Sequence, residues 1–390
     1  MSRRYEVIIV GGGPAGAAAA FFLGQAGRKV LLLEKEFLPR YKPCGGAVSA
    51  RVLEQFPISF DPVIQSRVSS ISYVMGGKAI TIPVPDSNLC MVMREQFDAY
   101  LLEHTQAEIR QGERVRSVVE TPDSVQVETA SGERIEADYL VAADGANSII
   151  ARALGLRRNK LLAAALEVEA DVPAQTLRQF AENPVFVFGE IRTGYIWIFP
   201  KANHLSIGIG GLKPNPGELQ TILNRVMAGF GIPLRKEAFH GHPVPIYAQD
   251  EPLGTRRCLL AGDAAGLVDP FTGEGIRFAI KSGRLAAQAI QSGQPERYTA
   301  WVRWSIGRNH TAGNWMRQTF YPLQGTWFEL ALRNPSVSRA LMDMFADRIG
   351  YGRLLLTIAA TFPRSFFTKK IPLAEFTQAS LPASPDIELP

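Results

Sequence analysis

Cysteine is scarce in this chain, and its placement excludes two classes of cross-linked protein. Only Cys44, Cys90 and Cys258 occur in 390 residues, and they form no C-x-x-C pair and have no histidine at ligand spacing. An odd count without such spacing argues against a disulfide framework and against a zinc site. We therefore expect no metal centre, a reducing compartment and, by default, a cytoplasmic protein.

Long apolar runs are missing as well. No uninterrupted stretch approaches the roughly 18–20 residues that a membrane-spanning helix needs. The first 22 residues imitate a signal peptide, because basic residues precede an apolar stretch, but three consecutive glycines and a proline interrupt that stretch. This start predicts a strand, a loop and a helix instead.

Sequence signals for nucleic-acid binding and for hydrolysis are also absent. The formal net charge is +5, yet the chain has no Lys/Arg-rich run, no zinc finger and no RNP-type aromatic motif. Residues 301–370 hold ten Lys and Arg against three Asp and Glu, so the positive excess is local. The motif G-x-S-x-G does not occur, so nothing indicates a hydrolase of that type. We expect no nucleic-acid partner.

The composition that remains is that of a globular protein, with 46% hydrophobic and 20% charged residues. Residues 5–10 form an apolar run, a glycine-rich turn and an Ala-rich segment follow, and residues 29–34 form a second apolar run. This order predicts a βαβ unit of a parallel sheet. Short strand-like runs between about 160 and 250 predict an antiparallel sheet.

We therefore expect an α/β fold: a Rossmann-type domain, an inserted antiparallel β-sheet substrate domain and a helical C-terminal segment. The expected boundaries are 1–160 with 250–295 for the first domain, part of the substrate-side strands included. The inserted domain spans 161–249, the helical segment 296–374 and a proline-rich tail 375–390.

The glycines at 11, 13 and 16 form a G-x-G-x-x-G motif between a predicted strand and a predicted helix. Gly11 permits the tight turn, Gly13 lets the backbone approach a pyrophosphate, and Gly16 lets helix and strand pack closely. Glu34 ends the next strand, where its carboxylate can accept from ribose hydroxyls and would repel a 2′-phosphate. This context favours a dinucleotide site over a glycine turn without a ligand.

A second glycine-rich segment spans residues 261–276. A predicted strand delivers Asp263 to a loop, where its carboxylate can bind ribityl or ribose hydroxyls. Gly273 and Gly275 expose backbone N–H groups at the start of a predicted helix, and these donors would stabilise negative charge on a reduced flavin. The alternative is a helix start that uses glycine for packing alone.

Four blocks of sequence together resemble the p-hydroxybenzoate-hydroxylase-type FAD-dependent superfamily: GGGPAG with Glu34, Arg94-x-x-Phe-Asp, the DGANS segment at 144–148, and GDAAGLVDPFTGEGI. Within it, the segments PRYKPCGG at 39–46 and GYIWIFPK at 194–201 resemble the two distinguishing motifs of the geranylgeranyl reductase family. The resemblance implies FAD and reduction of isoprenoid double bonds. Carried over by position, it implies FAD contacts at Ala15, Glu34, Gly45, Ala47, Arg94, Val115 (through the backbone), Asp263, Gly275 and Ile276.

The second of these motifs supports the narrower resemblance on physical grounds. In an extended strand Tyr195, Trp197 and Phe199 share one face, and Ile196 and Ile198 share the other. The aromatic face suits a long apolar isoprenoid substrate, which offers shape and dispersion but few hydrogen bonds. Against this stands ordinary strand packing, which also enriches aromatic residues.

A proton must reach the substrate if a double bond is to be saturated, and Cys44 or Tyr41 is the first candidate for its donor. By the resemblance, the loop of Cys44 lies beside the flavin ring system. The alternative is a cysteine that only packs as a small apolar side chain. The five histidines are scattered, which is typical of solvated or core residues.

Two rivals remain: a flavin-dependent monooxygenase or halogenase on the same fold, and a flavin-bearing lipid-binding protein without turnover. No second dinucleotide motif follows a strand, so we expect no separate nicotinamide domain. The expected electron donor is NADPH, bound without such a domain, or reduced ferredoxin. The polyprenyl group can belong to a chlorophyll precursor, a glycerophospholipid, a quinone or a diphosphate. Tryptophans and basic residues after 296 suit a membrane surface contact at the inner face of a membrane, a cap over the substrate, or a helical core with solvated arginines.

Overall fold

A computed structural model describes residues 5–84, 89–212, 216–234, 238–248 and 250–361. It divides the chain into two compact units, and each is described by itself. The first unit comprises residues 1–42, 94–162 and 244–314; the second comprises 43–93, 163–243 and 315–390. The expected tail at 375–390 lies outside the described residues.

The first unit is built on a sheet in the order β8-β2-β1-β11-β10-β9, with β17 beside β11. Its central strands β1 (Tyr5–Val10), β2 (Val30–Leu33), β11 (Arg134–Ala142), β8 (Glu108–Arg110) and β17 (Cys258–Leu260) pair in parallel. β9 (Val115–Glu120) and β10 (Val125–Thr129) add an antiparallel extension. The apolar runs of β1, β2 and β17 are almost wholly buried, as parallel strands covered on both faces must be.

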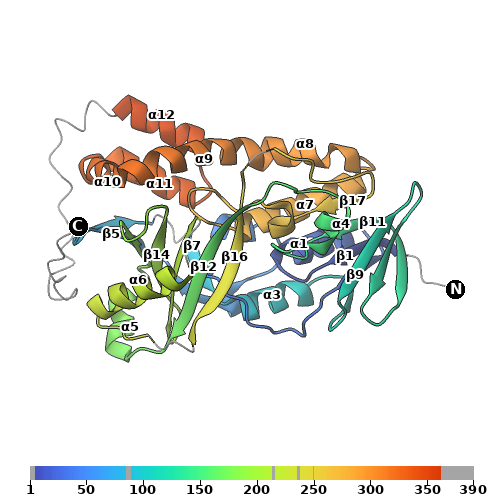
Figure 1. Ribbon diagram of the computed structural model, residues 1–390, viewed down its shortest axis with the longest axis horizontal. Coiled ribbons are helices and arrows are strands. Elements are labelled where there is room, and N and C mark those ends of the chain that lie inside the picture. Colours follow the sequence, from blue (N-terminus) through green and yellow to red (C-terminus); the bar gives the residue numbers. More distant parts are fainter. Residues whose placement is uncertain (1–4, 85–88, 213–215, 235–237, 249, 362–390) are drawn as a thin grey trace. The chain divides into compact units, whose positions relative to one another are not determined.

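Helices of the first unit pack closely against this sheet. α1 (Pro14–Gln25) and α7 (Ile276–Gln291) lie side by side (Figure 1), and a side chain at Gly283 would overlap the carbonyl oxygen of Ala15. The glycine at position 283 of α7 therefore allows the two helix backbones to approach closely. The other helices are α3 (Arg94–Glu103), α4 (Ile149–Ala153), α8 (Tyr298–Val302) and α9 (Arg308–Phe320), the last of which runs on into the second unit.

The second unit is built on a sheet in the order β16-β12-β15-β14-β13-β5-β6. Its strands are β12 (Leu161–Ala170), β15 (Leu205–Leu212), β14 (Gly194–Pro200), β13 (Val185–Phe188), β5 (Ser70–Met75), β6 (Lys78–Pro83) and β16 (His240–Ile246), of which β12 and β16 begin or end in the first unit. The pairs β12–β15, β15–β14, β14–β13 and β5–β6 are antiparallel, and β13 pairs with β5 in parallel. A smaller sheet contains β3 (Ala47–Ser49), β7 (Leu89–Val92) and β4 (Ile64–Arg67), and the short α2 (Ala50–Leu53) follows β3.

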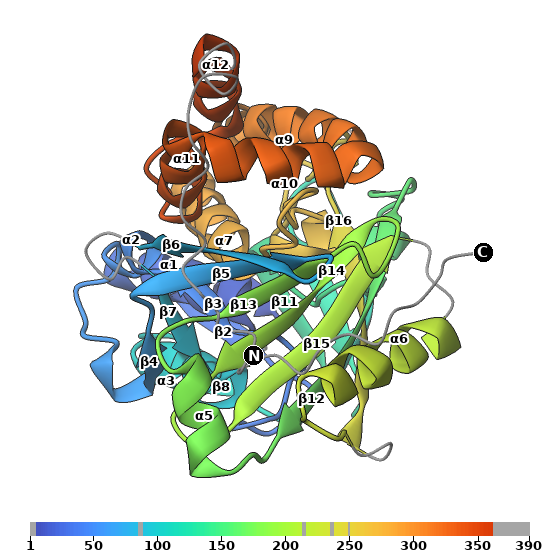
Figure 2. The same ribbon diagram turned by 90° about the vertical axis from the view of Figure 1, so that its left-hand side faces the viewer.

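The two faces of the large sheet bury different side chains. α5 (Ala174–Phe180) and α6 (Pro216–Gly229) cover one face (Figure 2), where Ile196 and Ile198 lie in an aliphatic core. Phe328 of α10 (Gln324–Arg333) and Met342 of α11 (Pro335–Phe345) pack on the other face, against Trp197 and the other aromatic residues; α12 (Tyr351–Thr361) follows. The alternation read from the strand is therefore confirmed.

The expected fold class is confirmed, with its parallel sheet, its largely antiparallel sheet and its C-terminal helices. The sequence did not indicate that β5 pairs with a strand more than a hundred residues later, which brings β5 and β6 into this sheet. The domain boundaries stay a prediction. In the part of the chain that the structure describes, no helix combines the length and the apolar character needed to cross a membrane.

Candidate functional site

The glycine-rich turn of the first unit forms an open cradle at the start of α1. A side chain at Gly16 would overlap the carbonyl oxygen of Gly11, and one at Gly11, where φ is +105°, would overlap that of Ala143. A Cβ on Gly13 would meet only the guanidinium of Arg94, at 3.8 Å. No side chain caps α1 and its first turn carries no acidic residue, so its N-terminal N–H groups are available to an anion.

Glu34 and Arg94 stand beside this cradle. The Gly12 N–H donates to Oε2 of the buried Glu34 at 2.6 Å, which fixes the carboxylate against the turn. Arg94 donates through Nε to Asp98 at 2.8 Å, and Arg40 donates to the same buried carboxylate at 3.1 Å. Asp98 thus pairs with two cations, of which Arg94 lies at the turn, where it can neutralise a pyrophosphate.

The second glycine-rich segment lies in the same unit and next to the first. A Cβ on Gly262 would lie 2.9 Å from that of Ala15, so the strand that delivers Asp263 ends beside α1. α7 begins at Ile276 with Gly275 as its uncapped N-terminal residue, and Gly273 has a φ of +72°. The structure therefore brings together the expected cofactor residues Gly11, Gly13, Ala15, Gly16, Glu34, Arg94, Asp263, Gly275 and Ile276.

No sequence motif marks the residues that shape the loop before α7. Asp269 accepts from the N–H groups of Phe271 and Thr272 at 2.9 and 2.8 Å, which closes a turn. The fully buried His310 packs edge-on to Phe278, and its Nδ1 lies 3.7 Å from Asp269. Burial lowers the pKa of His310, so a neutral imidazole supports this turn.

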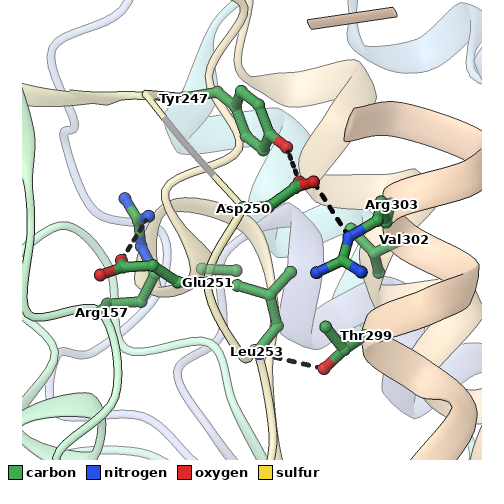
Figure 3. Close-up of a pocket in the computed structure, with 9 residues that line it drawn as sticks. Arg157, Tyr247, Asp250, Glu251, Leu253, Thr299, Val302 and Arg303 are labelled. Atoms are coloured by element: carbon green, nitrogen blue, oxygen red, sulfur yellow. Dashed lines mark hydrogen bonds and ion pairs between the residues drawn. The ribbon is translucent and has the colours of Figure 1, made fainter. Parts of the chain in front are cut away.

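A small pocket elsewhere in the first unit is closed by polar contacts (Figure 3). Tyr247 donates to Asp250, which also pairs with Arg303, and Arg157 pairs with Glu251 at 3.1 Å. The pocket has room for little more than one water molecule, so it does not take a substrate.

These features fit FAD. The cradle above Gly13 is left open where a Cβ would otherwise stand, and two uncapped helix starts with Arg94 offer donors and positive charge. Glu34 offers an acceptor suited to ribose. Gly11 to Gly16, Glu34 and Arg94 would hold the adenosine and pyrophosphate, and Asp263 with the start of α7 would hold the flavin side.

In the second unit, the loop of Cys44, Gly45 and Gly46 is held by a buried lysine. Lys201 Nζ donates to the carbonyl oxygen of Gly45 at 2.6 Å and to that of Val92 at 3.1 Å. A Cβ on Gly45 would lie 2.8 Å from the ring of Phe199 and 3.1 Å from Trp197 Nε1. Glycine is therefore required at 45 because the loop backbone lies directly against the aromatic face.

Tyr195, Trp197 and Phe199 belong to an extended aromatic face of the sheet. Trp197 of β14 lies opposite Phe186 of β13, which lies opposite Tyr73 of β5. On the other side Trp197 lies opposite Gly208, where any side chain would overlap the indole. Among the described residues, three buried atoms near these rings lack a hydrogen-bond partner: Trp197 Nε1, Tyr73 Oη and Ser206 Oγ.

The remaining expected residues fall at separate places. Val115 is buried at the start of β9 in the first unit, and Ala47 begins β3 in the second. Tyr41 is 37% exposed and belongs to the first unit, whereas the half-buried Cys44 belongs to the second. Their roles, like those of the aromatic residues, stay predictions. No group of three or more potential metal ligands occurs among the described residues.

The fold and the cradle define a class, and comparison with known proteins agrees. Residues 4–204 match a model of the FAD binding domain family. A geranylgeranyl bacteriochlorophyll reductase-like structure from Thermoplasma acidophilum covers 94% of this chain, and 98% of its own, with a TM-score of 0.75 and 24% identity. The flavin-dependent halogenase CmlS covers 93% of this chain and 78% of its own, with a TM-score of 0.67 and 19% identity, and so shares the fold. The protein is an FAD-dependent oxidoreductase.

Sequence relatives narrow the class. The geranylgeranyl diphosphate reductase of Rhodobacter capsulatus is 33% identical over 75% of this chain and 77% of its own length. The menaquinone reductase of Mycobacterium tuberculosis is 30% identical over 74% of this chain and 76% of its own. The chain belongs to the geranylgeranyl reductase family.

Proposed function

We propose that the protein saturates carbon–carbon double bonds of a geranylgeranyl or related polyprenyl group. The aromatic face of the second unit carries this proposal. It presents Tyr195, Trp197 and Phe199 in one row beside the Cys44–Gly46 loop. Such a face can give an isoprenoid dispersion contacts and needs almost no hydrogen bonds from it.

The chemistry divides between cofactor and chain. Reduced FAD, when bound, supplies a hydride to one alkene carbon, and a proton is added to the other. The chain holds the alkene in line, excludes water and oxygen, and places the acid. Because an isolated alkene accepts hydride poorly, the proton must accompany or precede it. Cys44 and Tyr41 are the proposed donors, and the buried Trp197 N–H is a donor that can orient an acceptor near the loop.

For the substrate and the electron donor we propose a chemical class and not one compound. The names of the relatives cover both a prenyl diphosphate and a quinone, which supports a polyprenyl chain as the common element. NADPH or reduced ferredoxin is proposed as the reductant. Contact with the inner face of a membrane through the C-terminal segment is proposed because Trp315, Leu323 and Leu356 are each more than half exposed.

The test uses the FAD-loaded protein, reduced chemically under anaerobic conditions and offered a panel of substrates. The panel contains geranylgeranyl diphosphate, a geranylgeranyl glycerophospholipid, a geranylgeranylated chlorophyll precursor and menaquinone. We expect at least one to gain two hydrogens per double bond by mass spectrometry. Oxygenated or halogenated product formed only after oxygen is admitted would instead support the monooxygenase or halogenase activity of this fold.

A further inference from the structure

Beneath the Cys44–Gly46 loop lies a group of ionisable residues that we call the carboxyl cluster: Glu167 and Glu169 of β12, Lys201 and His204. Glu167 pairs across the sheet with Gly208, which pairs with Trp197, and Glu169 pairs with Ser206, which pairs with Phe199. Residues opposite one another share a face of a sheet. The two carboxyl groups therefore lie on the face that carries the aromatic residues.

The cluster is buried far more deeply than charged side chains usually are. Glu167 is 1% exposed and Lys201 is 3% exposed. One lysine cation with two carboxylates would leave a buried negative charge, which is costly, whereas one added proton makes the three groups neutral together. Burial and the neighbouring Glu169 raise the pKa of Glu167 to about 8, so this proton is retained at neutral pH.

Hydrogen bonds connect the cluster to the surface on one side and to the Cys44 loop on the other. His204, 14% exposed at its side chain, approaches Glu169 Oε2 through Nε2 at 3.0 Å, and its Nδ1 approaches Asn203 Oδ1 at 2.7 Å. Glu167 and Glu169 lie two residues apart on one face of β12, and Glu169 is among the groups that raise the pKa of Glu167. Lys201 Nζ donates to the carbonyl oxygen of Gly45 at 2.6 Å, which connects the cluster to the Cys44 loop.

We propose that Glu167 and Glu169 share one proton and relay protons from His204 to the Cys44 thiol. The inference rests on the proposed function, in which each double bond takes a hydride at one carbon and a proton at the other. Cys44 gives its S–H proton to the second carbon and becomes a thiolate. The carboxyl pair returns a proton to the sulfur, and His204 replaces that proton from solvent. Glu167 does not contact the substrate in this scheme; it acts through Cys44, to which it returns the proton.

Other charged groups face the cluster and fit this role. Burial lowers the pKa of Lys201, whereas Glu169, Cys44 and Glu167 favour its charged form; the Lys201 cation in turn stabilises the negative charge that appears when the proton leaves. Cys90 of β7 also faces Lys201, and Arg67 of β4 acts on Cys90. Burial raises the pKa of Cys90 to about 11, so this second thiol remains protonated and takes no part.

A second observation points to the same place. Trp197 is 8% exposed, its Nε1 lies 3.1 Å from where a Cβ on Gly45 would stand, and it finds no acceptor among the described residues. A buried indole N–H normally has an acceptor. A molecule bound against the Cys44–Gly46 loop, beside the carboxyl cluster, can accept a hydrogen bond from the Trp197 N–H.

Infrared spectroscopy of the oxidised, FAD-loaded protein tests the shared proton. We expect the C=O band of one protonated carboxylic acid to disappear with a midpoint near pH 8, and the Glu167→Gln variant to lack this transition. Glu190→Gln is the matched control, because Glu190 is a solvent-facing partner of Arg225 in the same unit. A spectrum without a carboxylic acid band above about pH 6 in the wild-type protein would overturn the proposal.

The rate of Cys44 alkylation by iodoacetamide tests whether the carboxyl cluster acts on the thiol. Cys90 and Cys258 are buried, and the Cys44→Ser variant measures any label that they take up. We expect the wild-type rate to follow two ionisations and the Glu167→Gln rate only one. Lys201→Met should alkylate roughly tenfold more slowly at pH 8, because the thiolate loses its cation. Identical pH profiles in all three proteins would overturn the relay.

The proposed function is separated from the relay because both measurements use oxidised protein without substrate. If they fail while polyprenyl reduction is observed, the relay is wrong and the proposed function stands. If they succeed while every polyprenyl substrate is left unchanged, the proposed function fails. Once polyprenyl reduction is measured, the relay also predicts that its rate falls above about pH 8 in the wild-type protein and that Glu167→Gln abolishes this fall.

Discussion

At the residue scale, we predict that Glu34 decides whether a dinucleotide is held. Its carboxylate is buried and fixed by the Gly12 N–H, so replacement leaves no acceptor for ribose. We expect Glu34→Arg to weaken FAD binding at least roughly tenfold, since an arginine offers donors only and the lost charged hydrogen bond is worth about 1.5–3 kcal/mol. Recovery of flavin fluorescence on dilution measures the release. Glu36→Arg, at an exposed position two residues on, should bind FAD normally.

Cys44 separates a chemical role from a packing role. Serine is close in size, so Cys44→Ser should keep FAD bound and the protein folded while it slows turnover or changes the number of double bonds reduced. Product analysis by mass spectrometry gives both quantities. An unchanged rate and product pattern would mean that Cys44 only packs, and loss of flavin would mean that it shapes the loop.

Glu167 gives a stability prediction with a definite sign. Its pKa is about 8 in the folded protein against a usual value of 4.5, so between these values the folded state holds a proton that the unfolded state has released. Folding stability must then fall as pH rises, by at most about 1.4 kcal/mol per pH unit, and the fall ends above the folded pKa. Glu167→Gln does not titrate. Its melting temperature relative to wild type should therefore rise between pH 6 and about pH 9, and an unchanged difference would contradict the raised pKa.

At the element scale, strand β14 separates function from stability by face. Trp197→Ala should remove a large apolar contact from the substrate, at a cost of roughly 2–4 kcal/mol divided between binding and turnover. Ile198→Ala, on the aliphatic face, should lower thermal stability by about 2–5 kcal/mol and leave FAD content and product pattern unchanged. Thermal unfolding and product analysis of both variants distinguish the roles. The reverse pattern would place the substrate on the other face.

Elements also mark the limit of what the sequence could reveal. Strand periodicity placed Trp197 and Ile198 on opposite faces correctly, because that information is local. The pairing of β13 with β5 was not foreseen, since it joins distant segments through register that only the folded sheet defines.

The burial of charged residues in the second unit was also not predicted from the sequence. Glu167 and Glu169 alternate in a predicted strand and Lys201 directly follows another, so their common face could have been inferred. Their burial could not, because charged residues are normally solvated and only the folded sheet brings these three together. His310 was missed for the same reason, since the residues around it come from distant segments.

At the scale of the whole molecule, the proposed function requires the two glycine-rich motifs of the first unit and the aromatic face of the second to serve one reaction. The most direct measurement mixes the anaerobically reduced, FAD-loaded protein with the polyprenyl substrate and follows flavin absorbance and product mass together. We expect the flavin to be reoxidised without oxygen, with one double bond saturated for each FAD. A flavin that stays reduced until oxygen is admitted, with no gain of hydrogen in the polyprenyl chain, would contradict the proposed function.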